Sequence, residues 1–110
     1  MNYEKNDIIL VPFPFTDLSQ SKKRPALIIS PNEYNFGNDV IIAFITSNLN
    51  VEPKIGDYNI EDWQNSNLPK PSIIRMKFAT IDKAIIIKTL GKLAANDASN
   101  FNKLLLDFLK

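Results

Sequence analysis

Short apolar runs alternate with polar or proline-containing stretches over most of the chain. β-Branched and aliphatic residues dominate these runs, which is typical of β-strands. The most apolar run, residues 40–46, is expected near the middle of the sheet. The expected strands lie within residues 7–11, 25–30, 40–46, 72–81 and 85–93, with a short edge strand at 58–60. The intervening segments predicted as loops are 13–23, 31–39 and 61–71.

The last part of the chain has a different period. Apolar residues recur there at three- and four-residue steps, which predicts one face of a helix. These positions are Ala98, Phe101, Leu104, Leu105 and Phe108. Asn96 or Asp97 is expected as the N-cap, because short polar side chains accept hydrogen bonds from the first turn. The whole pattern predicts a mainly β (α+β) fold, a small, strongly curved β-barrel with the C-terminal helix packed on it. No repeat or linker interrupts it, so residues 1–110 are expected to form a single domain.

Composition narrows the possible chemistry. The chain has neither cysteine nor histidine, which excludes disulfides and thiolate chemistry and removes the commonest general base. Zinc prefers His and Cys ligands, and no tight acidic cluster suggests Mg²⁺, so we expect no metal and no other cofactor. The formal net charge of +1 argues against binding along long duplex DNA. Lys22, Lys23 and Arg24 nevertheless form a local cationic cluster.

The expected location is the cytoplasm, with no membrane association. Residues 1–7 are polar and lack the apolar segment of a signal peptide. No apolar run approaches the roughly 20 residues that a transmembrane helix needs.

Three blocks of the sequence, in this order, carry a family resemblance. They are DIILVPFPFTDLSQSKKRPALIIS (7–30), VIIAFITSN (40–48) and LPKPSIIRMKFATIDKAIIIKTLGKL (68–93). Together they resemble the PemK/MazF-like endoribonuclease toxins of type II toxin–antitoxin systems. Asn6 stands where that family usually has glycine, and asparagine tolerates positive φ better than most residues. The resemblance implies a homodimeric SH3-like barrel that cleaves single-stranded RNA without a metal. It also implies 2′-hydroxyl attack, a 2′,3′-cyclic phosphate product and inhibition by a cognate antitoxin protein.

The resemblance also implies roles for particular residues. Arg24 corresponds to the family's catalytic arginine, whose planar fork of donors matches two phosphate oxygens. Thr46 corresponds to the catalytic hydroxyl that stabilises the phosphate. Arg75 matches the arginine of an Arg-x-Asp segment, whereas Lys77 stands in place of its carboxylate. The expected RNA contacts are Lys22, Lys23, Ser47, Arg75, Lys77 and Phe15.

Each of these residues also has a structural interpretation. Taken without the family, Arg24 is one solvated charge beside two lysines, and Thr46 is a β-branched residue that ends a strand. Arg75 could contact phosphate, or it could pair with a surface carboxylate such as Glu61 or Asp62.

Aromatic and aliphatic residues leave similar alternatives open. Phe13, Phe15 and Trp63 could stack on bases, although such residues more often lie in a core or interface, which is our interpretation of Phe13. The leucines at 104–106 suit a core or a dimer contact. Two rival functions remain: a gyrase-poison-like toxin that binds a protein, and a catalytically weak RNA-binding member, which Lys77 favours.

Overall fold

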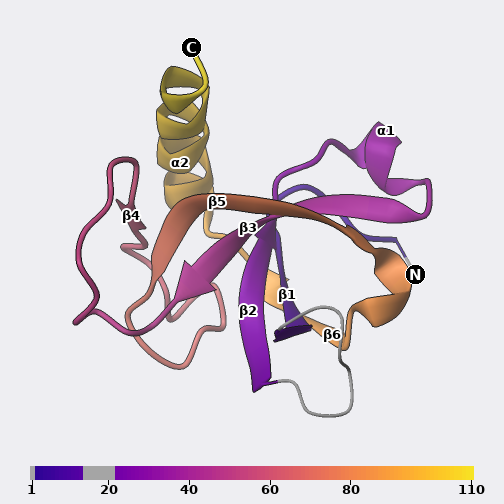
Figure 1. Cartoon of the computed structure of the whole chain (residues 1–110), viewed down its shortest axis with the longest axis horizontal. Helices are drawn as coiled ribbons and strands as arrows, with labels where there is room; N and C mark the ends of the chain where they lie inside the picture. Colours follow the sequence, from indigo (N-terminus) through magenta and orange to yellow (C-terminus); the bar gives the residue numbers. More distant parts are fainter. Residues whose placement is uncertain (1, 14–21) are drawn as a thin grey trace.

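A strongly twisted antiparallel sheet with a long helix at one side forms the framework of the protein (Figure 1). The computed structural model describes residues 2–13 and 22–110. In this part of the chain six strands form one sheet, in the order β4-β5-β3-β2-β1-β6. The strands are β1 (Asp7–Phe13), β2 (Lys22–Ile28), β3 (Asp39–Thr46), β4 (Tyr58–Asn59), β5 (Ile73–Asp82) and β6 (Lys88–Lys92). The helical elements are α1 (Asn32–Asn35), the 3-10 turn η1 (Lys83–Ile85) and α2 (Ala95–Phe108).

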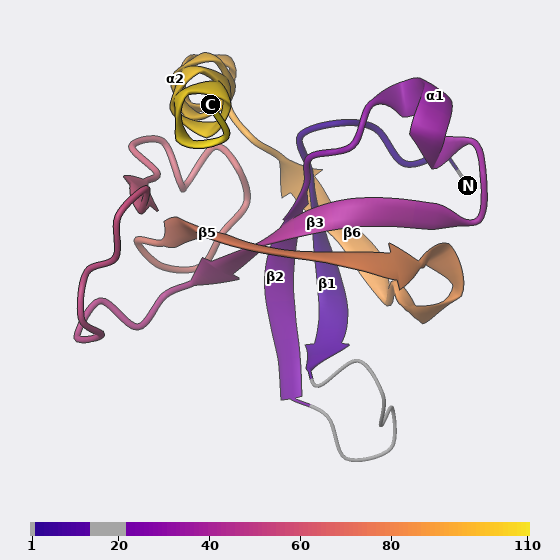
Figure 2. The same cartoon turned by 45° about the horizontal axis from the view of Figure 1, so that its top comes forward.

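The sheet is strongly curved, because the strand direction rotates from one side of the sheet to the other. In Figure 2, β3 and β5 run across the direction of β1 and β2, so the sheet forms a half-barrel. A register shift between Ala43 and Ile45 in the β3–β5 ladder adds to the local twist. The prediction of a mainly β, strongly curved fold with a C-terminal helix packed on it is confirmed.

The predicted strands are all present, with shifted ends. β3, the most apolar strand, lies inside the sheet as expected. β1 continues through Pro12 to Phe13, and β2 begins at Lys22, earlier than predicted. The segment 31–39, predicted as a loop, contains the one-turn helix α1. Four residues are too few to show a helical period, so the pattern did not reveal this helix.

Alternate strand residues fill two cores, one on each face of the sheet. On one face Phe101 and Leu105 of α2 pack with strand residues, and we call this the α2-side core. Its buried strand residues are Ile8, Leu27, Ala43, Ile45 and Ile74. The opposite core consists of Ile9, Val11, Ala26, Ile28, Val40, Ile42 and Ile81. Each fully buried aliphatic side chain contributes about 1.5–3 kcal/mol to folding.

A buried carboxylate joins α2 to the segment before β5. Asp97, in the first turn of α2, is fully buried. It accepts hydrogen bonds from the Tyr58 hydroxyl at 2.6 Å and from the backbone N–H groups of Glu61 and Asp62, each at 2.9 Å. Burial and the hydrogen bond to Asp97 raise the pKa of Tyr58 to about 12. The carboxylate therefore acts as a structural anchor.

This anchor explains why the predicted helix start is wrong. Asn96 or Asp97 was expected as the N-cap, but the N-cap residue is Ala94, and α2 begins at Ala95. No side-chain hydrogen bond caps the helix. The Asp97 carboxylate bonds to the 58–62 segment instead of to the first turn of its own helix.

Asn6 confirms the expectation of positive φ before the first strand. Its φ is 75°, in the left-handed region that asparagine tolerates. Its N–H donates to the carbonyl of Ile28 at 2.8 Å, and its carbonyl accepts from the N–H of Leu93 at 2.9 Å. The residue therefore ties the start of β1 to the end of β2 and to the residue after β6.

Several residues with open interpretations belong to the α2-side core. Trp63 is half-buried against this core, and Leu105 is buried within it, whereas Leu106 is exposed.

Among the described residues, no helix has the length and apolar character needed to span a membrane.

Candidate functional site

On the face opposite α2, the strands extend past the buried core, and every second residue still points to that face. On four neighbouring strands, an aromatic ring or a cation occupies the position that follows the core residues on this face. We call these four residues the cation–ring cluster: Phe13 of β1, Arg24 of β2, Phe44 of β3 and Lys77 of β5. The rings are half-buried and the two cations are exposed.

The four side chains form a chain of contacts. The guanidinium carbon of Arg24 lies 5.5 Å from the centroid of the Phe13 ring. The Phe13 and Phe44 rings meet edge to face, with centroids 5.6 Å apart at 89°. The Lys77 ammonium lies 5.3 Å from the centroid of the Phe44 ring. An exposed cation–π contact contributes about 0.5–1 kcal/mol, and an edge-to-face pair contributes about 0.5–1.5 kcal/mol. Both cations are thus held by rings.

The register of the β3–β5 ladder brings Lys77 to this cluster. In the β3–β5 ladder Ala43 pairs with Phe78 and Ile45 pairs with Ile74. Residues 75–77 of β5 therefore lie opposite Phe44 alone. Lys77 is the neighbour of Phe78, so the register that pairs Ala43 with Phe78 sets Lys77 across from Phe44. The Lys77 ammonium accordingly lies over the Phe44 ring.

Thr46 ends β3, two positions after Phe44, so strand alternation puts it on the same face as the cluster. It is half-buried, and its Oγ1 accepts a hydrogen bond from the N–H of Asn48 at 3.1 Å. Ser47, the next residue, is exposed. The hydroxyl of Thr46 is thus oriented by the backbone of the turn that follows the strand.

The charge on this face is positive. Lys22 is two residues from Arg24 and shares its face of β2, whereas Lys23 is on the other face. Within residues 2–13 and 22–110, none of Lys22, Lys23, Arg24 and Lys77 forms an ion pair with a carboxylate. In the same ranges no group of three or more acidic side chains is placed to hold a metal ion. The face therefore offers cationic donors, suited to an anionic ligand.

Arg75 is held differently. Its Nη2 donates to the Asp57 carboxylate at 3.2 Å and to the backbone carbonyl of Glu52 at 2.9 Å. The carboxylate partner is thus Asp57, not Glu61 or Asp62, which were suggested as examples. The backbone N–H groups of Glu61 and Asp62 instead bind the Asp97 carboxylate. Of the two interpretations of Arg75, phosphate contact or pairing with a carboxylate, the structure shows the second.

Comparison with known protein families shows the family to which the chain belongs. Residues 4–109 match the model of a family described as the PemK-like, MazF-like toxin of the type II toxin–antitoxin system. The chain belongs to this family. A comparison with curated protein sequences found no match.

Solved structures share the fold of this PemK/MazF-like protein. One is an endoribonuclease in complex with its cognate antitoxin from Mycobacterial species, with 17% identity, a TM-score of 0.75 and coverage of 98% of this chain and 93% of that one. MazF from Deinococcus radiodurans has 17% identity, a TM-score of 0.73 and coverage of 99% and 97%. The Mycobacterium tuberculosis toxin MazF-mt6 has 18% identity, a TM-score of 0.71 and coverage of 92% and 93%. At these identities the likeness establishes the fold.

Two ring residues of the cation–ring cluster were not recognised in the sequence. Phe13 was expected in a core or interface, and Phe44 was not singled out. Their position two residues after a buried core residue was the available signal, but period alone does not reveal which rings meet across strands. Phe15, a predicted RNA contact, lies outside the described residues.

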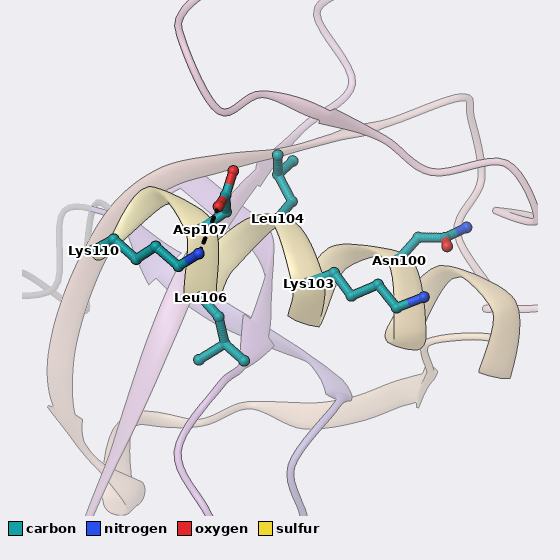
Figure 3. A pocket seen from close by; sticks show the side chains of 6 residues that line it. All are labelled: Asn100, Lys103, Leu104, Leu106, Asp107 and Lys110. Carbon is teal, nitrogen blue, oxygen red and sulfur yellow. Dashed lines mark ion pairs between the residues drawn. The ribbon is translucent and has the colours of Figure 1, made fainter.

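A hollow lies on a part of the surface away from the cation–ring cluster. It is broad and shallow, about 640 Å³, and lies on the outer surface of α2 (Figure 3). Its lining residues are Asn100, Lys103, Leu104, Leu106, Asp107 and Lys110. The one ion pair drawn there joins Lys110 to Asp107 at 3.4 Å, between neighbouring turns. Because α2 packs on the other face of the sheet, this hollow is separate from the cation–ring cluster.

Proposed function

We propose that this PemK/MazF-like protein is a metal-independent endoribonuclease toxin that cleaves single-stranded RNA in the cytoplasm. It acts as a homodimer and is inhibited by a cognate antitoxin protein. Arg24 and Thr46 are the catalytic residues. The observation that carries the proposal is the state of Arg24: exposed, held over the Phe13 ring, and not neutralised by any carboxylate of the described residues.

The proposed reaction is attack of a ribose 2′-hydroxyl on the adjacent phosphorus. The P–O bond to the 5′-oxygen breaks, and a 2′,3′-cyclic phosphate and a 5′-hydroxyl form. The pentacoordinate phosphorane carries more negative charge than the ground state, so donors aimed at it lower the barrier. The chain has no histidine, so proton transfer falls to its carboxylate, amine or hydroxyl groups or to water.

Arg24 supplies a planar fork of N–H donors to two phosphoryl oxygens. Thr46 supplies a hydroxyl donor. A hydroxyl has one hydrogen and two acceptor lone pairs, and the Thr46 oxygen accepts from the N–H of Asn48. That bond fixes the oxygen and leaves the hydroxyl hydrogen to donate to the phosphate.

The family and its relatives support the proposed partners. Among the structures with this fold is a Mycobacterial endoribonuclease bound to its cognate antitoxin, and another is a MazE–MazF complex from Deinococcus radiodurans. We infer that an antitoxin inhibits the present chain by covering its RNA-binding face.

Further RNA contacts are proposed for exposed residues near the catalytic pair. They are Lys22, Lys23, Ser47 and Lys77, together with Phe15. We leave Arg75 out of this set, because the Asp57 carboxylate and the Glu52 carbonyl hold its guanidinium. Lys77 shares the cation–ring cluster with Arg24, which supports a direct role in RNA binding.

The test is cleavage of a defined single-stranded RNA by purified protein in excess EDTA. Cleavage should persist and leave 2′,3′-cyclic phosphate and 5′-hydroxyl ends. The matched control is Arg24→Ala protein from the same purification, which separates the activity from contaminating nucleases. Products with 3′-hydroxyl and 5′-phosphate ends would contradict the mechanism, because attack by the 2′-hydroxyl does not produce them.

The same assay tests one rival function. A member that binds RNA without cutting it is favoured by Lys77, which stands where some members of the family have a carboxylate. A shifted RNA band without any cleavage product would support that rival.

A further inference from the structure

Phe44 links the two cations of the site. Its ring meets Phe13, which lies under Arg24, and the same ring lies under the ammonium of Lys77. Phe44 is only half-buried, at a position where β3 leaves the opposite core. Its ring therefore contacts Lys77 directly and contacts Arg24 through the Phe13 ring.

Lys77 gains a fixed position from this contact. A lysine side chain on an open surface samples many rotamers, and binding a ligand must restrict them. The electrostatic attraction between the ammonium and the ring face favours one region of space. Within the described residues Lys77 has no carboxylate partner, so its N–H donors remain available to an anion.

The geometry favours phosphate over a nucleobase as the ligand at this position. One face of each ring carries a cation, and the two rings meet edge to face. Base stacking would compete with those cations for the ring faces, whereas phosphate binding uses the cations where they are.

We propose that Phe44 is a positioning residue that holds Lys77 for a second backbone phosphate of single-stranded RNA, beside the phosphate bound by Arg24. This inference rests on the proposed function. Lys77 makes the contact, and Phe44 acts through Lys77 without touching the reacting atoms. The β3–β5 register, in which Ala43 pairs with Phe78, sets Lys77 across from Phe44 and is the feature of the fold that creates the pair.

The test is the salt dependence of RNA binding. A single-stranded RNA with 2′-O-methyl groups lacks the attacking hydroxyl, so binding is measured without cleavage. For single strands, the slope of log K against log salt concentration is about −0.7 for each neutralised phosphate. Lys77→Met should make the slope less steep by about 0.7. Phe44→Leu should produce a similar change although it removes no charge, and the double variant should add little more.

Matched variants separate positioning from general damage. Phe44→Tyr keeps the ring and should keep the wild-type slope. Lys103→Met removes an exposed charge from α2, on the other side of the sheet, and should also keep it. Circular dichroism checks folding, and Phe44→Met replaces Phe44→Leu if the leucine variant melts below the assay temperature.

A wild-type slope in the folded Phe44→Leu or Phe44→Met protein would overturn the inference. Failure of the proposed function is visible separately. Wild-type protein that neither cleaves unmodified RNA nor binds the 2′-O-methyl RNA would overturn the proposed function itself.

Discussion

The two faces of the sheet hold their charged groups by different means. On the α2 side, the Asp97 carboxylate is fully buried and accepts three hydrogen bonds. On the opposite face, Arg24 and Lys77 are exposed and lie over the rings of Phe13 and Phe44. A carboxylate whose acceptors are filled from within the protein stabilises the fold. A cation held by a ring keeps its N–H donors for a ligand.

This difference separates stability from function. Changes at Arg24 should alter RNA cleavage and leave the fold almost untouched, because surface substitutions outside a packed core have small effects on stability. Changes at Asp97 should do the reverse, since they leave buried donors without an acceptor.

The largest expected effect is that of Arg24→Ala on cleavage. Losing one donor to the developing charge costs about 3–4 kcal/mol of transition-state stabilisation, roughly a hundred- to thousandfold in rate. Arg24→Lys should restore little, because a point charge does not reproduce the bidentate fork. Single-turnover cleavage of one defined RNA measures the effect.

The neighbouring cation provides the control for Arg24. Lys23→Ala removes the same charge from the other face of β2 and should cause a small, salt-sensitive loss of binding. Equal and mild effects of Lys23→Ala and Arg24→Ala would show that Arg24 is ordinary surface charge and that the active site lies elsewhere.

A smaller effect, on stability, is expected for Asp97→Ala. The Tyr58 hydroxyl and the backbone N–H groups of Glu61 and Asp62 would lose their acceptor, with an expected loss of about 2–3 kcal/mol. Urea unfolding followed by circular dichroism measures it. Asp97→Asn keeps one carbonyl acceptor and should lose less. Cleavage per folded Asp97→Ala molecule should stay at the wild-type rate. An unchanged urea midpoint for Asp97→Ala would mean that the anchor does not stabilise the fold.

The smallest effect is a pH dependence at Tyr58. Its pKa rises to about 12 in the folded protein from an ordinary value of 10. The folded state therefore favours the protonated phenol, so this stabilisation is complete below pH 10 and is lost as the pH rises toward 12. Lysines titrate in the same range, so the measurement is the difference in unfolding free energy between wild type and Tyr58→Phe. That difference should shrink above pH 10, and two parallel curves would contradict the expectation.

Period and composition predicted the strands and the helix, because a buried face repeats every two residues in a strand and every three or four in a helix. Contacts between elements were harder to predict. The N-cap prediction failed because the Asp97 carboxylate bonds to a segment far away in the sequence. The sequence left open whether Arg75 pairs with a carboxylate, and it did not single out Asp57, which lies beside Arg75 in space. Glu61 and Asp62, the suggested examples, bind Asp97 through their N–H groups.

The candidate site was predictable only in part. The resemblance to known toxins singled out Arg24 and Thr46, and strand alternation puts both on one face. The roles of Phe13 and Phe44 depend on cross-strand register. Lys77 reaches Phe44 because Ala43 pairs with Phe78 in the β3–β5 ladder. Periodicity indicates the face on which a residue lies, but not its partner on the next strand.

The order of the elements has a consequence for synthesis on the ribosome. All four residues of the cation–ring cluster precede α2 in the chain, yet Phe101 and Leu105 of α2 complete the core on the other face. At roughly 5–20 residues added per second, residues 95–108 are completed about a second or more after β6. Until they arrive, the α2-side core lacks Phe101 and Leu105, and the N–H groups of Glu61 and Asp62 lack their acceptor. The cluster is thus synthesised before the helix that completes the fold supporting it.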